Sequence, residues 1–168
     1  TEGVNKYCGV PDSLLKNICA YISDNSNPGE HLITANEGSA VSLAVGHYIS
    51  TGNPTLVYMQ NSGFGNAINP LLSIADNKVY GIPMLLMIGW RGEPGVKDEP
   101  QHLKQGEVMV DLLKACGLPF MIIDSETKNV RDILKTAVNL TLSKKHPVVL
   151  LVKKGAFKPY KLKKTNPD

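Results

Sequence analysis

The chain has 168 residues, of which 42% are hydrophobic and 20% are charged, and its formal net charge is +3. This length suits one packed domain, and the composition is that of a globular protein rather than of a disordered one. Its apolar runs are far shorter than the roughly 20 residues that cross a bilayer, and its first residues are not signal-like, so we expect a cytoplasmic protein without a membrane span.

Short β-rich runs alternate with segments of helical length along the chain. In chain order, the sequence predicts strands at 6–8, 31–34, 55–59, 84–88, 120–123 and 148–152. It predicts helices between them at 13–23, 37–50, 66–76, 103–115 and 130–143. Apolar strands that alternate with helices belong to parallel sheets covered on both faces. The predicted fold class is therefore α/β, a doubly wound, six-stranded, mainly parallel sheet with helices on both faces.

The end of the chain differs in charge from the rest. Residues 153–168 contain six Lys and one Asp, whereas the preceding residues carry 12 basic and 14 acidic side chains. We predict a domain at 1–152 and a basic tail or linker at 153–168. The lysines are few and interrupted by proline, so we expect no nucleic-acid partner.

Residue spacings argue against disulfides, a metal site and a phosphate-binding P-loop. Cys8, Cys19 and Cys116 are an odd number without C-x-x-C spacing, which favours reduced, buried thiols over disulfides or zinc ligands. The sequence has no H-E-x-x-H motif, no phosphate-binding loop of the P-loop type and no close His/Asp/Glu cluster. We expect no metal bound by this chain itself.

Ligands of doubly wound sheets bind outside the carboxyl ends of the strands, so the loops there are the candidate site. Glu37 follows a predicted strand and begins a helix capped by Asn36. A carboxylate has an ordinary use there, because it stabilises a helix N-terminus by about 0.3–1 kcal/mol. The helix that follows is rich in small residues, which let a flat ligand or another backbone come close. They are Gly38, Ser39, Ala40, Ser42, Ala44 and Gly46.

The glycine-rich segment 60–66 fits neither of two common motifs. A hydrolase nucleophile elbow needs glycine two residues before and after Ser62, where Gln60 and Phe64 stand. A dinucleotide fingerprint from Gly63 needs a third glycine where Ile68 stands. Two interpretations stay open: a turn that brings backbone close to a ligand, and a plain connection between a strand and a helix.

The loop 89–102 is too long for a plain connection. Arg91 has the forked donors that grip a phosphonate, sulfonate or carboxylate, and His102 is a residue type that moves protons near neutral pH. The alternative is a surface loop with a salt bridge at its rim.

Five segments in this order resemble the thiamine diphosphate-dependent decarboxylases that act on phosphonopyruvate and sulfopyruvate. The segments are 9–15, 35–40, 59–66, 89–92 and 98–102. The resemblance implies the pyrimidine-binding domain of a 2-oxo-acid decarboxylase. The first expectation is conversion of 3-phosphonopyruvate to phosphonoacetaldehyde and CO2. The alternatives are a sulfopyruvate decarboxylase alpha subunit and a non-catalytic α/β domain for assembly or regulation.

The resemblance also implies roles for single residues. Glu37 would be catalytic and bind the cofactor, with its carboxylate hydrogen-bonded to N1′ of the aminopyrimidine. Ser62, Gly63 and Phe64 would line the pyrimidine pocket. The substrate side would hold Asp12, Ser13, Gln101 and His102, to which we add Arg91 from its charge and position.

One part of the family pattern is missing from the chain. Family members hold the cofactor diphosphate through Mg²⁺ on a second domain with a Gly-Asp-Gly motif, which this sequence lacks. The resemblance thus implies a diphosphate-binding domain or subunit as partner, in a homo- or hetero-oligomer. The chain would be a natural alpha subunit or a fragment of a longer polypeptide, inactive alone.

Overall fold

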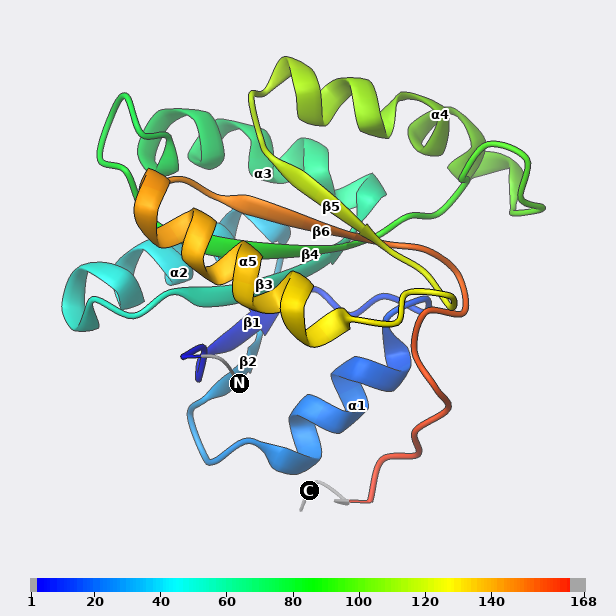
Figure 1. Cartoon of the computed structure of the whole chain (residues 1–168), viewed down its shortest axis with the longest axis horizontal. Helices are drawn as coiled ribbons and strands as arrows, with labels where there is room; N and C mark the ends of the chain where they lie inside the picture. The colour runs from blue at the N-terminus through cyan, green and yellow to red at the C-terminus, as the bar shows by residue number, and fades with distance from the viewer. Residues whose placement is uncertain (1–2, 164–168) are drawn as a thin grey trace.

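The computed structural model describes residues 3–163, in which six strands form one sheet (Figure 1). The strands are β1 (Tyr7–Gly9), β2 (His31–Ile33), β3 (Thr55–Gln60), β4 (Met84–Gly89), β5 (Phe120–Ile123) and β6 (Val148–Val152). Their order is β2-β1-β3-β4-β6-β5, and every adjacent pair is parallel. The predicted fold class is confirmed.

Five α-helices connect the strands. They are α1 (Lys16–Asn25), α2 (Glu37–Thr51), α3 (Phe64–Pro70), α4 (Pro100–Ala115) and α5 (Val130–Lys144). Where one helix is predicted at 66–76, the structure has two consecutive pieces, α3 and a π turn η2 (Leu71–Ala75), and a 3₁₀ turn η1 (Asn61–Gly63) comes before them. Pro70 accounts for the change, because proline lacks the N–H that a regular helix needs. Within residues 3–163, no helix is both long and apolar enough to span a membrane.

Helices cover both faces of the sheet (Figure 1). One apolar core lies between the sheet and α2, α3 and α4, and a second lies between the sheet and α1 and α5. The central strand β4 is buried along its whole length. Burial on both faces is the reason its sequence is apolar throughout instead of alternating with polar residues.

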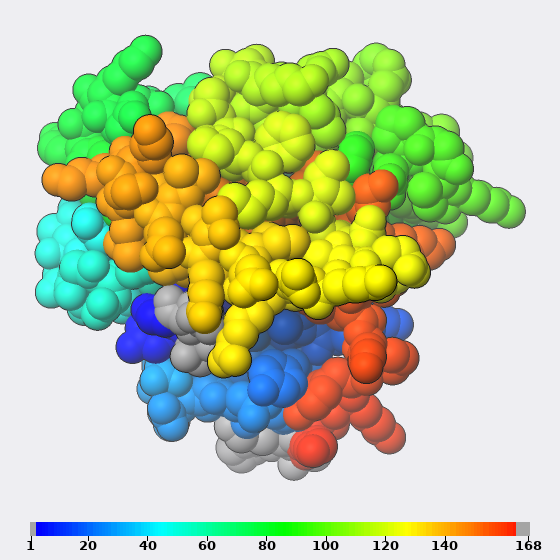
Figure 2. Space-filling view, in the orientation of Figure 1, coloured from blue at the N-terminus to red at the C-terminus, as the bar shows by residue number. Residues whose placement is uncertain are grey.

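The described part of the basic tail packs against α1 (Figure 2). The side chain of Asn17 accepts a hydrogen bond from the backbone N–H of Tyr160, at 3.2 Å, and donates one to the carbonyl of Phe157. The rings of Tyr21 and Tyr160 meet edge to face, with centroids 5.3 Å apart. The division between domain and tail at 152/153 stays a prediction, and the tail's last residues, 164–168, lie outside the described residues.

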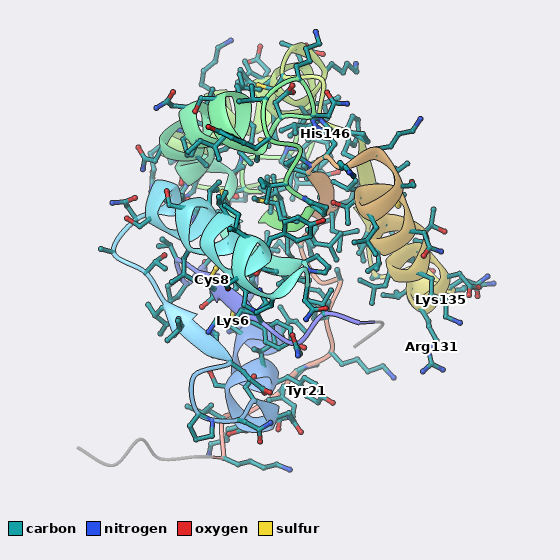
Figure 3. All side chains as sticks on the ribbon, turned by 90° about the vertical axis from the view of Figure 1, so that its left-hand side faces the viewer. Lys6, Cys8, Tyr21, Arg131, Lys135 and His146 are labelled. Carbon is teal, nitrogen blue, oxygen red and sulfur yellow. The ribbon has the colours of Figure 1, made fainter. Side chains whose placement is uncertain are left out.

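All three cysteines are free thiols. Cys8 on β1 is fully buried beneath α2, where its Sγ donates to the carbonyl of Ala40 at 3.4 Å (Figure 3). Burial raises the pKa of the Cys8 and Cys19 thiols to about 12. Since only thiolates are good nucleophiles, neither side chain is reactive at neutral pH. Cys19 and Cys116 are only partly buried, so the expectation of burial holds fully for Cys8 alone.

Candidate functional site

Glu37 is a buried carboxylate at the start of α2. The predicted cap is present: Asn36 is extended, and its Oδ1 accepts the N–H of Ser39 at 2.8 Å. Only 8% of Glu37 is exposed. Its Oε2 accepts a hydrogen bond from Asn66 Nδ2 at 2.9 Å, and no residue among 3–163 donates one to Oε1. One carboxylate oxygen is therefore held by Asn66, and the other has no donor among the described residues.

The glycine-rich loop lies directly against this carboxylate. A Cβ built on Gly63 would stand 2.0 Å from Glu37 Oε1 and 2.3 Å from its carboxyl carbon. A Cβ on Gly38 would stand 2.8 Å from the carbonyl oxygen of Asn66. The first turn of α2 and the loop 60–66 thus form one closely packed unit, and an approach of this loop to a ligand stays a prediction.

Ser62 and Phe64, the neighbours of Gly63, point to different surroundings. Ser62 is exposed at the sheet's carboxyl edge. Phe64 is 1% exposed and belongs to the apolar core against α2, α3 and α4. Of these two predicted pocket residues, only Ser62 has an exposed side chain, and Phe64 supports the loop from beneath.

Asp12 joins the loop after β1 to the loop after β3. It is 5% exposed, and its Oδ1 accepts a hydrogen bond from Gln60 Nε2 at 2.8 Å. Its Oδ2 accepts the backbone N–H of Leu14 at 3.1 Å. Gln60 in turn accepts the Ser62 hydroxyl at Oε1. Gln60 was not among the predicted site residues, although its place at the end of a buried strand was a usable signal.

The guanidinium of Arg91 is hydrogen-bonded to other side chains of the protein. Its Nε donates to Asp98 Oδ2 at 2.8 Å, Nη2 donates to the other oxygen of Asp98, and Nη1 donates to Ser13 Oγ at 2.9 Å. These three residues line an open cavity of about 370 Å³, together with Trp90 and Lys154. A role for Arg91 in gripping an anion stays a prediction. In this structure Asp98 balances the charge of Arg91, and Ser13 accepts a hydrogen bond from Arg91.

The ion pair gives a pH-dependent contribution to stability. The pKa of Asp98 lies well below its ordinary value, first because Arg91 donates to the carboxylate, and then because the N–H groups of Gly92 and Glu99 do so. A carboxyl with a lowered folded-state pKa stabilises the fold above its unfolded pKa, and this contribution is lost as the pH falls through the folded value.

We therefore expect the free energy of unfolding to decrease as the pH is lowered below about 4, where Asp98 in the unfolded chain begins to be protonated. Asp98→Asn should be less stable than the wild type at neutral pH, and its free energy of unfolding should decrease less steeply as the pH is lowered. Urea denaturation from neutral to acid pH measures both. Asp111→Asn, which changes an exposed carboxylate paired with Lys114, is the control and should keep the wild-type decline. An equally steep decline in Asp98→Asn would contradict the assignment.

Asn61 fixes the long loop to the end of β3. Its side-chain amide donates to the carbonyl of Arg91 at 2.8 Å and accepts the N–H of Arg91 at 3.0 Å, and the residue is 4% exposed. Trp90 Nε1 donates to the carbonyl of Gly106 at 2.9 Å. Asn61 is a second site residue missed from the sequence, where an asparagine directly after a strand was the available signal.

Gln101 and His102 lie in the first turn of α4, which begins at Pro100, three residues earlier than predicted. Proline favours the first turn of a helix, since its missing N–H has no intrahelical partner there. Gln101 is exposed and His102 is half-buried. Among the described residues, no hydrogen bond joins either side chain to Asp12, Gln60 or Glu37, so their substrate role stays a prediction.

A groove between α2 and α3 flanks Glu37. It has a volume of about 500 Å³ and is lined mostly by small and polar residues. They are Asn36, Gly38, Ser39, Ser42, Asn69, Pro70, Ser73 and Ile74. The small-residue face of α2 is thus open on the surface.

A doubly wound sheet with a buried acid and a close glycine loop at its carboxyl edge has these groups where α/β domains of this class bind their ligands. Residues 1–115 match the family described as thiamine pyrophosphate enzyme, N-terminal TPP binding domain. The chain belongs to this family of thiamine pyrophosphate enzymes.

Similar proteins agree with this membership. The chain is 32% identical over 166 residues to phosphonopyruvate decarboxylase of Streptomyces viridochromogenes. The aligned region is 98% of this chain but 41% of that protein. It is 30% identical over 151 residues to sulfopyruvate decarboxylase subunit alpha of Methanococcus maripaludis, and the aligned region is 90% of this chain and 87% of that subunit. The crystal structure of benzoylformate decarboxylase from Polynucleobacter necessarius matches 99% of the chain and 31% of that protein, with a TM-score of 0.68 and 19% identity, which supports the fold.

Proposed function

We propose that this chain is the pyrimidine-binding part of a thiamine diphosphate-dependent decarboxylase of small anionic 2-oxo acids. The substrate that we propose first is 3-phosphonopyruvate, which would give phosphonoacetaldehyde and CO2. The observation that carries the proposal is the buried Glu37 carboxylate, which has one oxygen held by Asn66 and the other without a partner among residues 3–163. The names of the relatives support the reaction class.

The residues present fit an aminopyrimidine. A ring nitrogen that carries a proton needs a hydrogen-bond acceptor, and an anionic one such as Glu37 Oε1 makes the stronger bond. A flat ring fits beside backbone that has no side chain in the way. Because Gly63 has no side chain, the loop backbone lies directly against the carboxylate of Glu37. Glu37 would hold a proton at N1′ of the ring, and Asn66 would keep the carboxylate oriented. The bound cofactor supplies the electron sink that decarboxylation requires.

The substrate side of the proposal contains Asp12, Ser13, Arg91, Gln101 and His102. Asp12 and Ser13 follow β1, and Arg91 follows β4, so these three come from loops at the same edge of the sheet. Arg91 holds Ser13 through its hydroxyl, which fixes the position of this loop. Gln101 and His102 enter the proposal through the family resemblance alone.

The partner in this proposal is a domain or subunit that binds the cofactor diphosphate through Mg²⁺, so that the active enzyme is an oligomer. The subunit name of the Methanococcus relative supports a second chain. Among residues 3–163, no three His, Cys, Asp or Glu side chains gather as a metal site, and we assign Mg²⁺ to the partner. We place the enzyme in the cytoplasm, and the free thiols suit a reducing compartment.

Sulfopyruvate is the second candidate substrate, because the chain covers 87% of the Methanococcus alpha subunit. The test is CO2 release from phosphonopyruvate and from sulfopyruvate, with thiamine diphosphate and Mg²⁺, by this chain combined with its diphosphate-binding counterpart. We expect turnover that needs both parts, with phosphonopyruvate preferred. Preference for sulfopyruvate would reassign the substrate, and turnover of neither would favour a non-catalytic assembly or regulatory domain.

A further inference from the structure

Asp12 is a buried carboxylate beneath the loops of the candidate site. Only 5% of the residue is exposed, and both carboxylate oxygens already accept hydrogen bonds, one from Gln60 and one from the backbone of Leu14. A Cβ on Gly89 would stand 2.3 Å from Oδ2, so β4 closes over the carboxylate. With so little of the residue exposed, Asp12 is placed to influence a ligand through the groups that it holds more than by direct contact.

Gln60 is the group that extends from Asp12 toward the surface. A carboxylate only accepts hydrogen bonds, so Asp12 requires the NH₂ end of the Gln60 amide, at 2.8 Å. This orientation turns the Gln60 carbonyl oxygen toward Ser62. The oxygen also only accepts, and the Ser62 hydroxyl donates to it. Each member of the chain thus fixes the direction of the next hydrogen bond.

The end of this chain has a defined polarity. Ser62 is exposed, and its single hydroxyl proton is used on Gln60. Toward a ligand, the Ser62 oxygen therefore presents lone pairs. It is an acceptor that meets an N–H or O–H donor. A free serine hydroxyl would rotate and serve as either donor or acceptor.

We propose that Gln60 is a positioning residue, held by Asp12, that orients the Ser62 hydroxyl as a hydrogen-bond acceptor for an N–H or O–H group of the bound cofactor or substrate. The catalytic consequence rests on the function proposed above. The hydrogen-bond chain itself does not, because it belongs to the protein without any ligand.

Nuclear magnetic resonance tests the chain of hydrogen bonds without any turnover. The sequence contains three glutamines, Gln60, Gln101 and Gln105, so selective ¹⁵N-glutamine labelling of the full chain gives few side-chain signals, and Gln60→Leu assigns one of them. We expect one Gln60 amide proton to be shifted downfield by the carboxylate, and this shift to be lost in Asp12→Ala. An unshifted signal, or the same shift in Asp12→Ala, would overturn the inference.

A double-mutant cycle in the complete enzyme tests the catalytic role. If Asp12 and Ser62 act as a unit, Asp12→Ala and Ser62→Ala should be non-additive in kcat/KM by about tenfold, and become additive when Gln60→Leu removes the link. Gln105→Leu, on an exposed position of α4, is the matched control and should leave the coupling intact. Coupling that is absent, or that survives Gln60→Leu, would overturn the inference.

The readout of Ser62→Ala identifies the donor. A weaker Kd for thiamine diphosphate, measured by fluorescence quenching, would place the donor on the cofactor. An unchanged Kd with a higher KM or lower kcat would place it on the substrate. Either result supports the proposal, and no change in any of the three constants would contradict it. If the amide proton is shifted as expected but no substrate is turned over, the proposed function fails and the hydrogen-bond chain stands.

Discussion

Glu37→Gln should lower decarboxylation by the complete enzyme by about 100-fold or more, the usual size of a proton-transfer contribution. The substituted amide still accepts a hydrogen bond from Asn66, so the fold and the capped start of α2 should be kept. In the proposed function, what is lost is the anionic oxygen that would hold a proton at N1′ of the cofactor's aminopyrimidine ring. The measurement is kcat/KM for CO2 release, with far-UV circular dichroism to confirm that the variant is folded.

Glu107→Gln is the matched control for this substitution. Glu107 lies on the exposed face of α4, where it pairs with Lys104, and an exposed pair of this kind contributes little. Its activity should equal that of the wild type. If Glu37→Gln lost no more than about tenfold, a change of about 1.4 kcal/mol in the activation free energy, the catalytic role of Glu37 would be wrong.

Gly106→Ala should produce the largest loss of stability among single methyl additions to the chain. A Cβ at this position would stand 1.8 Å from the carbonyl oxygen of Gly92 and 2.6 Å from that of Arg91. These are backbone atoms, so α4 must move away from the loop that carries Arg91. We expect a loss of about 3 kcal/mol in the free energy of unfolding, measured by urea denaturation of the full chain.

Gly46→Ala adds the same methyl group to a helix in open space, since nothing lies within 4 Å of the position. Alanine is the better helix former, so this variant should gain about 0.5–1 kcal/mol. The two substitutions are chemically identical and should have opposite signs. A gain in Gly106→Ala would show that α4 does not pack on the loop as described.

The fold could be predicted from the sequence because its signals are local. Each apolar run bounded by polar or turn residues became a strand, with ends within one residue of the prediction. The helices were predicted less closely: α1 begins at Lys16, three residues later than predicted, and two further errors involve proline, which can either begin or interrupt a helix. Pro100 starts α4 earlier than the apolar periodicity indicates, and Pro70 accompanies the change from α3 to a π turn. Local propensity leaves open which of these two effects applies.

The candidate site was less predictable, because its geometry depends on which loops meet. The cap of Glu37 follows from sequence alone, and so does its place at the start of a helix. The contact between Asp12 and Gln60 joins residues 48 positions apart, and the contact between Asn61 and Arg91 joins residues 30 apart. Both depend on the pairing of β3 with β1 and with β4, which no local pattern specifies.

The order of the strands separates the fixed parts of the site from the part that is free to fluctuate. The strand that leads to Glu37, β2, is a three-residue edge strand, and Ile33 at its end is 69% exposed. Short edge strands open first in hydrogen exchange, whereas the buried face of α2 belongs to the core. The carboxylate is therefore anchored from the helix after it, through Ala40, Val41 and Ala44. Local fraying of β2 is therefore expected to leave Glu37 in place.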